Sequence, residues 1–463
     1  MKTKINVSIQ SLTKEAKSDC TGGRKGDAVR YCQSEQIRYD MGRAKEMMLE
    51  MEHEPLSGVS DRLVSAHLFK NKLVHDYVFK HGFDGTCSYC GDTTKVLPLR
   101  LIVEKVDSIV LRYFGDPNNE GLGWDSHFDD EDVPGFHSEG GGYITPNNRY
   151  FNDDMRQLLF DTGFRVENDD LESDIAAALG YHMQLVEKDP YGLNGAEERW
   201  VDWQYIKQSA VNMAKSGQSL EAMLRAEAAR LDYLKSDIYQ AQTPLQIERE
   251  LTLYRTVNYN SKRRPLLYRD LTSPPVKFTG NMRMSAKGDS VFYGATGKET
   301  TLQEAVKEKG NTYCYVGLFR TKHPLRLLDL TGIPGNLTIY DQEQYHLLLF
   351  LRNFCEAVSE YVPNHDAIQY APTQLITYFF RNKLKHYDQN RNAHPIDGIL
   401  FTSSKNGATN AVLFYDNKTS SEHLELLEWE LMYNGRIKHH IYSQWMKNIE
   451  VFLAIVRRMW MCR

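Results

Sequence analysis

The chain has no long run of apolar residues. Its richest apolar stretches, residues 346–350 and 451–456, are short and flanked by charge, whereas a membrane-spanning helix needs roughly 20 apolar residues. The basic start at Met1 is not followed by an apolar core, so the N-terminus does not resemble a signal peptide. We therefore expect a cytoplasmic protein that does not bind a membrane.

The chain also contains few cysteines and has no excess of positive charge. The 7 cysteines are odd in number and scattered, which argues against a disulfide framework. Lysine and arginine total 56 against 61 acidic residues, and no basic tract stands out. A net charge of −5 without such a tract argues against a dedicated nucleic-acid-binding protein.

The overall composition is that of an ordinary folded protein. It is 41% hydrophobic, 25% charged and 11% aromatic, which excludes wholesale disorder. A length of 463 residues favours two or three domains. We predict a polar leader over 1–40, a helical domain over 41–245, an α+β domain over 250–416 and a C-terminal extension over 417–463.

The hydrophobic spacing changes near residue 250. Before it, helical spacing predicts helices over 43–52, 62–78, 99–114, 152–164, 169–183, 197–214 and 219–233. A stretch rich in glycine, proline, asparagine and aspartate, 115–148, predicts a long loop, and we interpret its acidic cluster 129–132 as solvated. After it, short β-branched or aromatic runs predict strands at 266–268, 291–293, 313–319, 325–328, 398–401 and 411–415, with helices over 301–307, 342–359 and 372–384. The fold class expected is therefore α+β.

An ordered series of residues runs through this second half. It comprises Tyr268-Arg269, Arg283, Tyr293, Glu304, Tyr370-Ala371-Pro372-Thr373-Gln374, Asp397-Gly398-Ile399-Leu400-Phe401-Thr402-Ser403, Gly407, Asn410 and Leu413-Phe414. Each piece alone is a weak signal, but their order and spacing together are fairly specific.

The series resembles the RES family, which is named for an arginine, a glutamate and a serine. This chain departs from it in having Phe401 where many members have tyrosine, and in having only Gly280 before the second arginine. The resemblance implies a split antiparallel sheet with flanking helices that clamps NAD, as in ADP-ribosylating toxins. It also implies an enzyme that hydrolyses or phosphorolyses NAD, or transfers ADP-ribose to a protein.

The residue types suit that chemistry. Arginine can bind a pyrophosphate through two donors, which suits Arg269 and Arg283. Cleavage of the nicotinamide–ribose bond passes through an oxocarbenium-like species that a carboxylate at Glu304 would stabilise. Tyr293 would stack on nicotinamide, and Ser403 would fix the ribose or the carboxylate. We predict Glu304, Arg283 and Ser403 as catalytic, with Gln374 structural.

The N-terminal half carries Cys87-x-x-Cys90, which is half of a zinc knuckle. The region resembles the HEPN-related helical domain that is often fused to RES modules, where a second cysteine pair lies upstream. Here that position holds Ser65-Ala66-His67-Leu68, with His75 and His81 nearby. We expect two reduced thiols rather than a metal site. If zinc does bind, Cys87 and Cys90 are the candidate ligands, and His67, His75 or His81 could substitute for the missing cysteines.

HEPN ribonucleases use an arginine and a histidine separated by four residues on one helix. Arg62 with His67 and Arg381 with His386 both have this spacing. The pattern arises readily by chance, so a HEPN-type ribonuclease is one alternative function. A non-catalytic NAD-binding regulatory module is the other.

The function predicted from the sequence is that of an NAD-consuming, toxin-like enzyme in a toxin–antitoxin or phage-defence setting. Because unrestrained NAD consumption would be lethal, we expect an antitoxin, or inhibition by the fused N-terminal half or the C-terminal extension. A protein target of ADP-ribosylation and homo-oligomer formation remain open, and we expect no nucleic-acid partner.

Overall fold

The structure is a computed structural model of the whole chain. It describes residues 56, 59–120, 151–182, 184–188, 201–241, 245–259, 267–303, 313–360, 362, 366–403 and 406–432, and the backbone alone of 123–125, 142–144, 304–305, 433 and 436–442. The predicted leader 1–40, the helix over 43–52, the acidic cluster 129–132 and the last part of the C-terminal extension, 443–463, lie outside these residues. Among the described helices, none combines the length and apolarity that crossing a membrane requires.

The N-terminal part begins with a small sheet and a helix packed on it. Strands β1 (Leu63–Ser65), β3 (Thr93–Pro98) and β2 (Phe83–Thr86) form an antiparallel sheet in that order. The short 3-10 helix η2 (Ala66–Leu68) and helix α3 (Lys72–His81) follow β1. The helix predicted over 62–78 is therefore wrong in its first half, because Val64 pairs with Leu97 across β1 and β3.

Three further helices complete this core. They are α4 (Leu99–Tyr113), α5 (Met155–Asp161) and α6 (Asp169–Leu179). Asp154 and Asn168 cap α5 and α6 by accepting backbone N–H groups. Short strands lie between and after them: β4 (Phe114–Gly115), β5 (Gly123–Asp125), β6 (Gly142–Ile144), β7 (Phe151–Asn152) and β8 (Leu185–Glu187). The predicted loop 115–148 thus contains the short hairpin of β5 and β6.

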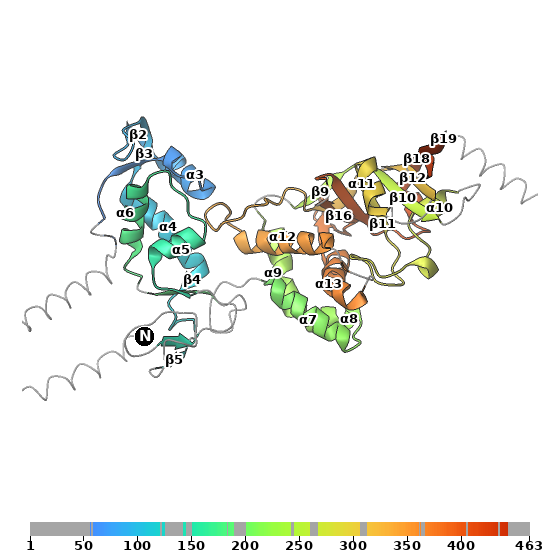
Figure 1. Cartoon of the computed structure of the whole chain (residues 1–463), viewed down its shortest axis with the longest axis horizontal. Coiled ribbons are helices and arrows are strands. Elements are labelled where there is room, and N and C mark those ends of the chain that lie inside the picture. The colour runs from blue at the N-terminus through green and yellow to red at the C-terminus, as the bar shows by residue number, and fades with distance from the viewer. Residues whose placement is uncertain are drawn as a thin grey trace, which may run out of the picture.

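Helices α7 (Trp203–Lys215), α8 (Leu220–Ala226) and α9 (Ala228–Tyr239) precede the main sheet. They share a hydrophobic core with α12 (Tyr345–Ser359) and α13 (Ala367–Lys383), in which Trp203 packs edge-on against Phe350 and Phe354. Figure 1 shows α7, α8 and α9 beside α12 and α13, away from the N-terminal helices. These three helices therefore pack on the C-terminal half of the chain.

A large sheet forms the centre of that half. Its strands are β9 (Gln246–Arg249), β10 (Thr252–Tyr259), β11 (Phe292–Ala295), β12 (Tyr313–Thr321), β13 (Leu325–Asp329), β16 (Gly398–Thr402), β17 (Thr409–Leu413), β18 (Leu424–Tyr433) and β19 (Arg436–Tyr442). The order is β19-β18-β12-β10-β11-β17-β16-β13-β9, and only the β13–β16 pair is parallel. The remaining elements are α10 (Tyr268–Leu271), η3 (Val276–Phe278), α11 (Lys298–Ala305), α14 (Ser420–His423) and the hairpin of β14 (Lys385–Tyr387) and β15 (Ala393–Pro395). The predicted α+β class is confirmed.

Successive side chains along the strands point alternately into two hydrophobic cores, one on each face of the sheet. Phe292 and Leu400 belong to one core, together with Phe319 of β12. Their neighbours Tyr293 and Phe401 pack on the opposite face, against the core that α12 and α13 cover. This alternation is the normal consequence of successive strand residues pointing to opposite faces.

Two local predictions in this half are wrong. The strand predicted over 266–268 does not form, because Tyr268 begins the short helix α10. The helix predicted from Pro372 begins earlier, at Ala367, where the Asp366 side chain accepts the N–H of Ile368. Strand β10, which pairs along its whole length with β12, was not predicted.

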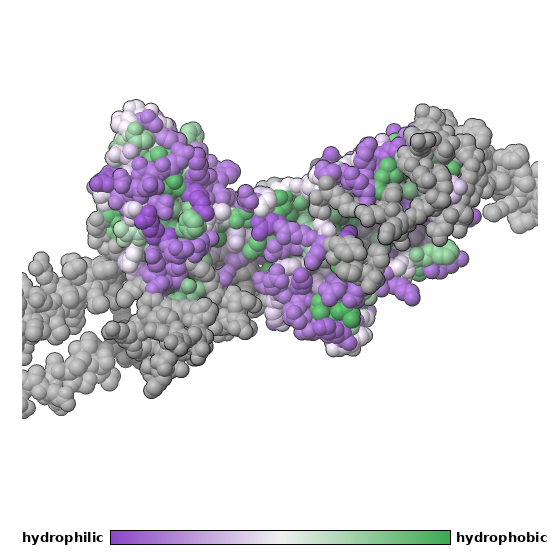
Figure 2. All heavy atoms as spheres, viewed as in Figure 1, coloured by the Kyte–Doolittle hydropathy of each residue, from purple (hydrophilic) through white to green (hydrophobic). Residues whose placement is uncertain are grey.

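A segment after β13 connects the two halves. Ile339 and Tyr340 are buried in the N-terminal core, although they belong to the C-terminal half of the sequence. The N–H of Leu73 donates to the carbonyl of Tyr340 at 2.9 Å, and the N–H of Lys72 donates to Asp341 Oδ1 at 2.7 Å. Figure 1 shows this orange segment reaching from the sheet half to α3 and α4, and Figure 2 shows two lobes whose visible described surface is mostly hydrophilic. The two lobes are therefore held together by specific contacts as well as by the chain.

Candidate active site

The sheet opens between β10 and β11. Only one residue pair, Tyr254 with Ala295, joins these two strands, whereas β11 pairs with β17 over its whole length. The carbonyl of Tyr293, which lies beyond that single pair, accepts a hydrogen bond from Arg255 Nη1 at 2.7 Å. The guanidinium of Arg255 thus lies in the split between the strands.

Arg255 has an unusual environment for an arginine. Its Nε donates to the carbonyl of Thr272 at 3.1 Å, and its guanidinium lies 5.2 Å from the ring centre of Phe292. Desolvation lowers the pKa of Arg255 to about 10. The hydrogen bonds to the carbonyls of Thr272 and Tyr293 are made to backbone groups, which do not neutralise the charge of the guanidinium.

The loop that carries Arg283 is fastened to β11 and α13. Ser285 Oγ and Tyr293 Oη lie 3.0 Å apart, and burial raises the pKa of Tyr293 to about 12. Thr373 Oγ1 donates to the carbonyl of Arg283 at 2.5 Å. These contacts fix the backbone of the loop, so the position of Arg283 is determined by the fold.

Gln374 completes this attachment. Its Nε2 donates to the carbonyls of Met282 and Ser285, at 2.8 and 3.1 Å. The amide group is therefore used to hold the loop, which agrees with the structural role predicted for it. Among the hydrogen bonds made by described residues, the guanidinium of Arg283 has one. Its Nε donates to the carbonyl of Glu360 at 3.0 Å.

Helix α11 packs against β10 next to Arg255. Thr256 Oγ1 donates to Thr301 Oγ1 at 2.9 Å, and Thr301 Oγ1 donates to the carbonyl of Lys298. Glu304 lies in the last turn of this helix, and its side chain is outside the described part of the structure. Position 304 follows position 301 by three residues, so the two share one face of the helix.

Ser403 lies at the end of β16, close to the start of α11. It is 3% exposed, its N–H donates to the carbonyl of Ala408, and its carbonyl accepts from Gly407. In the same turn, Asn406 Nδ2 donates to Thr300 Oγ1 of α11 at 2.7 Å. The fold therefore brings the Ser403 turn, α11 and the split around Arg255 into one region.

Two protein-family models match parts of the chain. The RES domain model matches residues 252–433, and the model of HEPN/RES N-terminal domain 1 matches residues 80–212. Residues 252–433 therefore belong to the RES domain family. This membership supports an NAD-related, toxin-like function in general. No curated protein and no solved structure matches the chain.

The RES domain begins at β10 and includes β18. Its match starts at Thr252 and so includes Tyr254-Arg255, a second Tyr-Arg pair that was not among the predicted site residues. The predicted pair, Tyr268-Arg269, instead lies on α10, where Arg269 is exposed and its carbonyl accepts a bond from Asn417 Nδ2. The enrichment of 252–259 in β-branched and aromatic residues was a usable signal for this strand.

The two arginine–histidine patterns do not each lie on one helix. Arg62 precedes β1 and pairs with Asp174, while His67 lies on η2. Arg381 lies on α13 and donates to Asp289, while His386 lies on β14 and pairs with Glu248 at 3.3 Å. The helical arrangement that the ribonuclease alternative requires is therefore absent from both of these described segments.

Proposed function

We propose that the RES domain of this chain cleaves the nicotinamide–ribose bond of NAD. The observation that carries the proposal is Arg255, a part-buried arginine in the opening of the sheet, whose guanidinium donates to the backbone carbonyls of Thr272 and Tyr293. A desolvated cation of this kind is stabilised by an anionic ligand, and a pyrophosphate supplies two oxygens that match the guanidinium. The match to the NAD-related RES family supports NAD as the ligand.

The proposed division of roles follows the geometry of the split. Arg255 and Arg283 would bind the pyrophosphate, with Arg255 taking the role predicted for Arg269. The ring of Tyr293 would stack on nicotinamide, and Ser403 would fix the ribose. Glu304 would stabilise the positive charge that develops on the ribose as the bond breaks.

The reaction is balanced without a further reagent. The bond between ribose C1′ and the pyridinium nitrogen breaks, and its electron pair remains on nicotinamide, which leaves as a neutral molecule. An oxygen of water, phosphate or a protein side chain then bonds to C1′, and a proton is released if the acceptor carried one. All three acceptors approach the same ribosyl cation, so the proposal covers hydrolysis, phosphorolysis and ADP-ribose transfer.

A toxin-like role in a toxin–antitoxin or phage-defence setting extends this proposal. NAD consumption needs restraint, and the N-terminal half is joined to the RES domain by the buried Tyr340 segment. We propose that this half limits access to, or movement of, the site. If a separate antitoxin inhibits the enzyme, restraint by the N-terminal half is not required.

The direct test is nicotinamide release by the purified full chain supplied with NAD. We expect release by the wild type and its loss, by about 100-fold or more, in Glu304→Gln. His67→Ala and His386→Ala should retain full release, because under this proposal neither touches NAD. Loss of NAD cleavage in the histidine variants but not in Glu304→Gln would contradict the proposal.

A further inference from the structure

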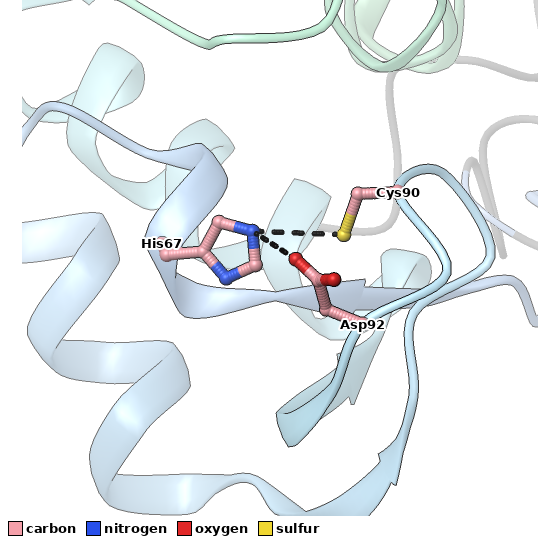
Figure 3. A group of neighbouring side chains, drawn as sticks. All are labelled: His67, Cys90 and Asp92. Carbon is pink, nitrogen blue, oxygen red and sulfur yellow. Dashed lines mark hydrogen bonds and ion pairs between the residues drawn. The ribbon is translucent and has the colours of Figure 1, made fainter.

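Three metal-binding side chains meet near the N-terminal sheet. His67 Nε2 lies 3.6 Å from Cys90 Sγ and 3.2 Å from Asp92 Oδ2, and the three ligand atoms lie within 4.8 Å of one another. Figure 3 shows the imidazole directed toward both the thiol and the carboxylate. His67 comes from η2, whereas Cys90 and Asp92 come from the turn between β2 and β3.

The backbone fixes the turn that carries two of these ligands. The N–H of Cys87 donates to the carbonyl of Asp92 at 2.8 Å, and the N–H of Gly91 donates to the carbonyl of Cys87 at 3.0 Å. Gly91 has a φ of 78°, a conformation that glycine adopts without steric cost. The N–H of Ser88 donates to the carbonyl of Leu63, and Ser88 Oγ accepts the N–H of Leu63, so the turn is also tied to β1.

The histidine is oriented from its other ring nitrogen. Ser65 Oγ lies 2.6 Å from His67 Nδ1, and Ser65 is fully buried at 0% exposed. A hydrogen bond at Nδ1 fixes the ring and leaves Nε2 to face Cys90 and Asp92. Metal-binding histidines commonly have such a partner on the nitrogen that does not bind the metal.

We propose that His67, Cys90 and Asp92 bind one Zn²⁺ ion, with water in the fourth position. Zn²⁺ accepts nitrogen, thiolate and carboxylate ligands at about 2.0–2.3 Å in a tetrahedral arrangement. That arrangement places neighbouring ligand atoms about 3.3–3.6 Å apart, close to the 3.6 and 3.2 Å observed here. Mg²⁺ and Ca²⁺ prefer oxygen ligands, so the nitrogen and sulfur select a transition ion.

This site differs from the one that the sequence suggested. There, Cys87 and Cys90 were the candidate ligands, with His67, His75 or His81 as possible substitutes for the missing cysteines. Cys87 is buried at 2% exposed and is not part of the cluster, whereas Asp92 is. The three ligands are exposed, which leaves room for the water. The ion would connect η2 to the β2–β3 turn, and binding would release the thiol proton of Cys90 to solvent.

The test is metal binding by the full chain, first stripped of metal and then supplied with Co²⁺ or Zn²⁺ alone. We expect about one ion per chain and, with Co²⁺, a thiolate-to-cobalt charge-transfer band. Cys90→Ser should abolish the band, and His67→Ala and Asp92→Asn should each weaken affinity by at least about tenfold. Zn²⁺ should raise the melting temperature of the wild type but not that of Cys90→Ser.

Matched controls separate this site from general thiol or histidine binding. His75→Ala removes a neighbouring histidine, and Cys87→Ser removes the buried thiol, and both should keep the band and the stoichiometry. The three ligand side chains are exposed, so their variants should fold. Circular dichroism verifies this, and also the folding of Cys87→Ser, whose side chain is buried. A wild type without the band would overturn the proposal, as would a band that survives His67→Ala and Asp92→Asn but is lost in Cys87→Ser.

Discussion

At the scale of single residues, the arginines show how much depends on the strand that carries them. Arg255 and Arg269 each follow a tyrosine, so the two pairs have the same local sequence. Arg255 lies on β10 with its guanidinium in the split, whereas Arg269 is exposed on α10. The difference arises from pairing with β12, which a local motif does not encode.

This difference predicts opposite outcomes for two matched substitutions. Arg255→Lys keeps the charge but loses the planar fork that bonds the carbonyls of Thr272 and Tyr293 and would bind a pyrophosphate. We expect NAD cleavage by Arg255→Lys to fall about 100-fold, and cleavage by Arg269→Lys to stay within about twofold of wild type. Nicotinamide release, with melting temperatures as the control for folding, measures both. A larger loss of NAD cleavage in Arg269→Lys than in Arg255→Lys would instead assign pyrophosphate binding to Arg269.

At the scale of elements, strand β16 illustrates what the sequence could predict. Its apolar run and the entry Asp397-Gly398 predicted a buried strand, which the structure confirms over Gly398–Thr402. Asp397 accepts bonds from the backbone N–H and the Nε of Arg326, so the strand entry is fixed by the neighbouring β13. Alternation and turn residues are local signals, and they identified most strands and helices of the RES domain.

The glycine at this strand entry gives a stability prediction. A Cβ at Gly398 would lie 2.4 Å from the carbonyl oxygen of Val412 and 2.8 Å from Leu413 Cδ2. Because the closest atom belongs to the backbone of β17, Gly398→Ala must displace a strand, and we expect a loss of about 1–3 kcal/mol in the free energy of unfolding. Gly332→Ala, where nothing lies within 4 Å, is the control. Equal urea midpoints for the two variants would refute the steric account.

Contacts between distant elements could not be predicted in the same way. The Thr373-Gln374 pair was predicted on a helix, but its bonds to the carbonyls of Met282, Arg283 and Ser285 depend on tertiary packing. The metal-ligand cluster has the same limitation, since His67 and Asp92 meet only when β1 pairs with β3. The types of these residues could be identified in the sequence, whereas the residues that they contact are determined by the tertiary fold.

At the scale of the whole molecule, the two lobes are joined by a buried side chain. Tyr340 is 0% exposed, and its hydroxyl lies 3.0 Å from Thr162 Oγ1 of the N-terminal part. Asn71 Nδ2 donates to Thr338 Oγ1 and to Asp341 Oδ2 in the same segment. Nothing in the local pattern of 338–341 indicates that these residues complete a core formed mainly by residues 56–185.

This connection predicts coupled unfolding of the lobes. Tyr340→Ala should cost about 3–5 kcal/mol and should separate a single thermal transition into two in calorimetry. The matched control is Tyr387→Ala, because Tyr387 is 53% exposed. If the N-terminal half restrains the enzyme, Tyr340→Ala should also raise NAD cleavage per folded molecule. Unchanged cleavage with separated transitions would argue against that restraint.

We propose above that this RES-domain protein consumes NAD through the site around Arg255 and α11. The most direct measurement is the cellular NAD concentration shortly after induction of the wild type beside Glu304→Ala. We predict a rapid fall in NAD, followed by growth arrest, with the wild type alone. Growth arrest with NAD unchanged, or an equal fall with Glu304→Ala, would contradict the claim.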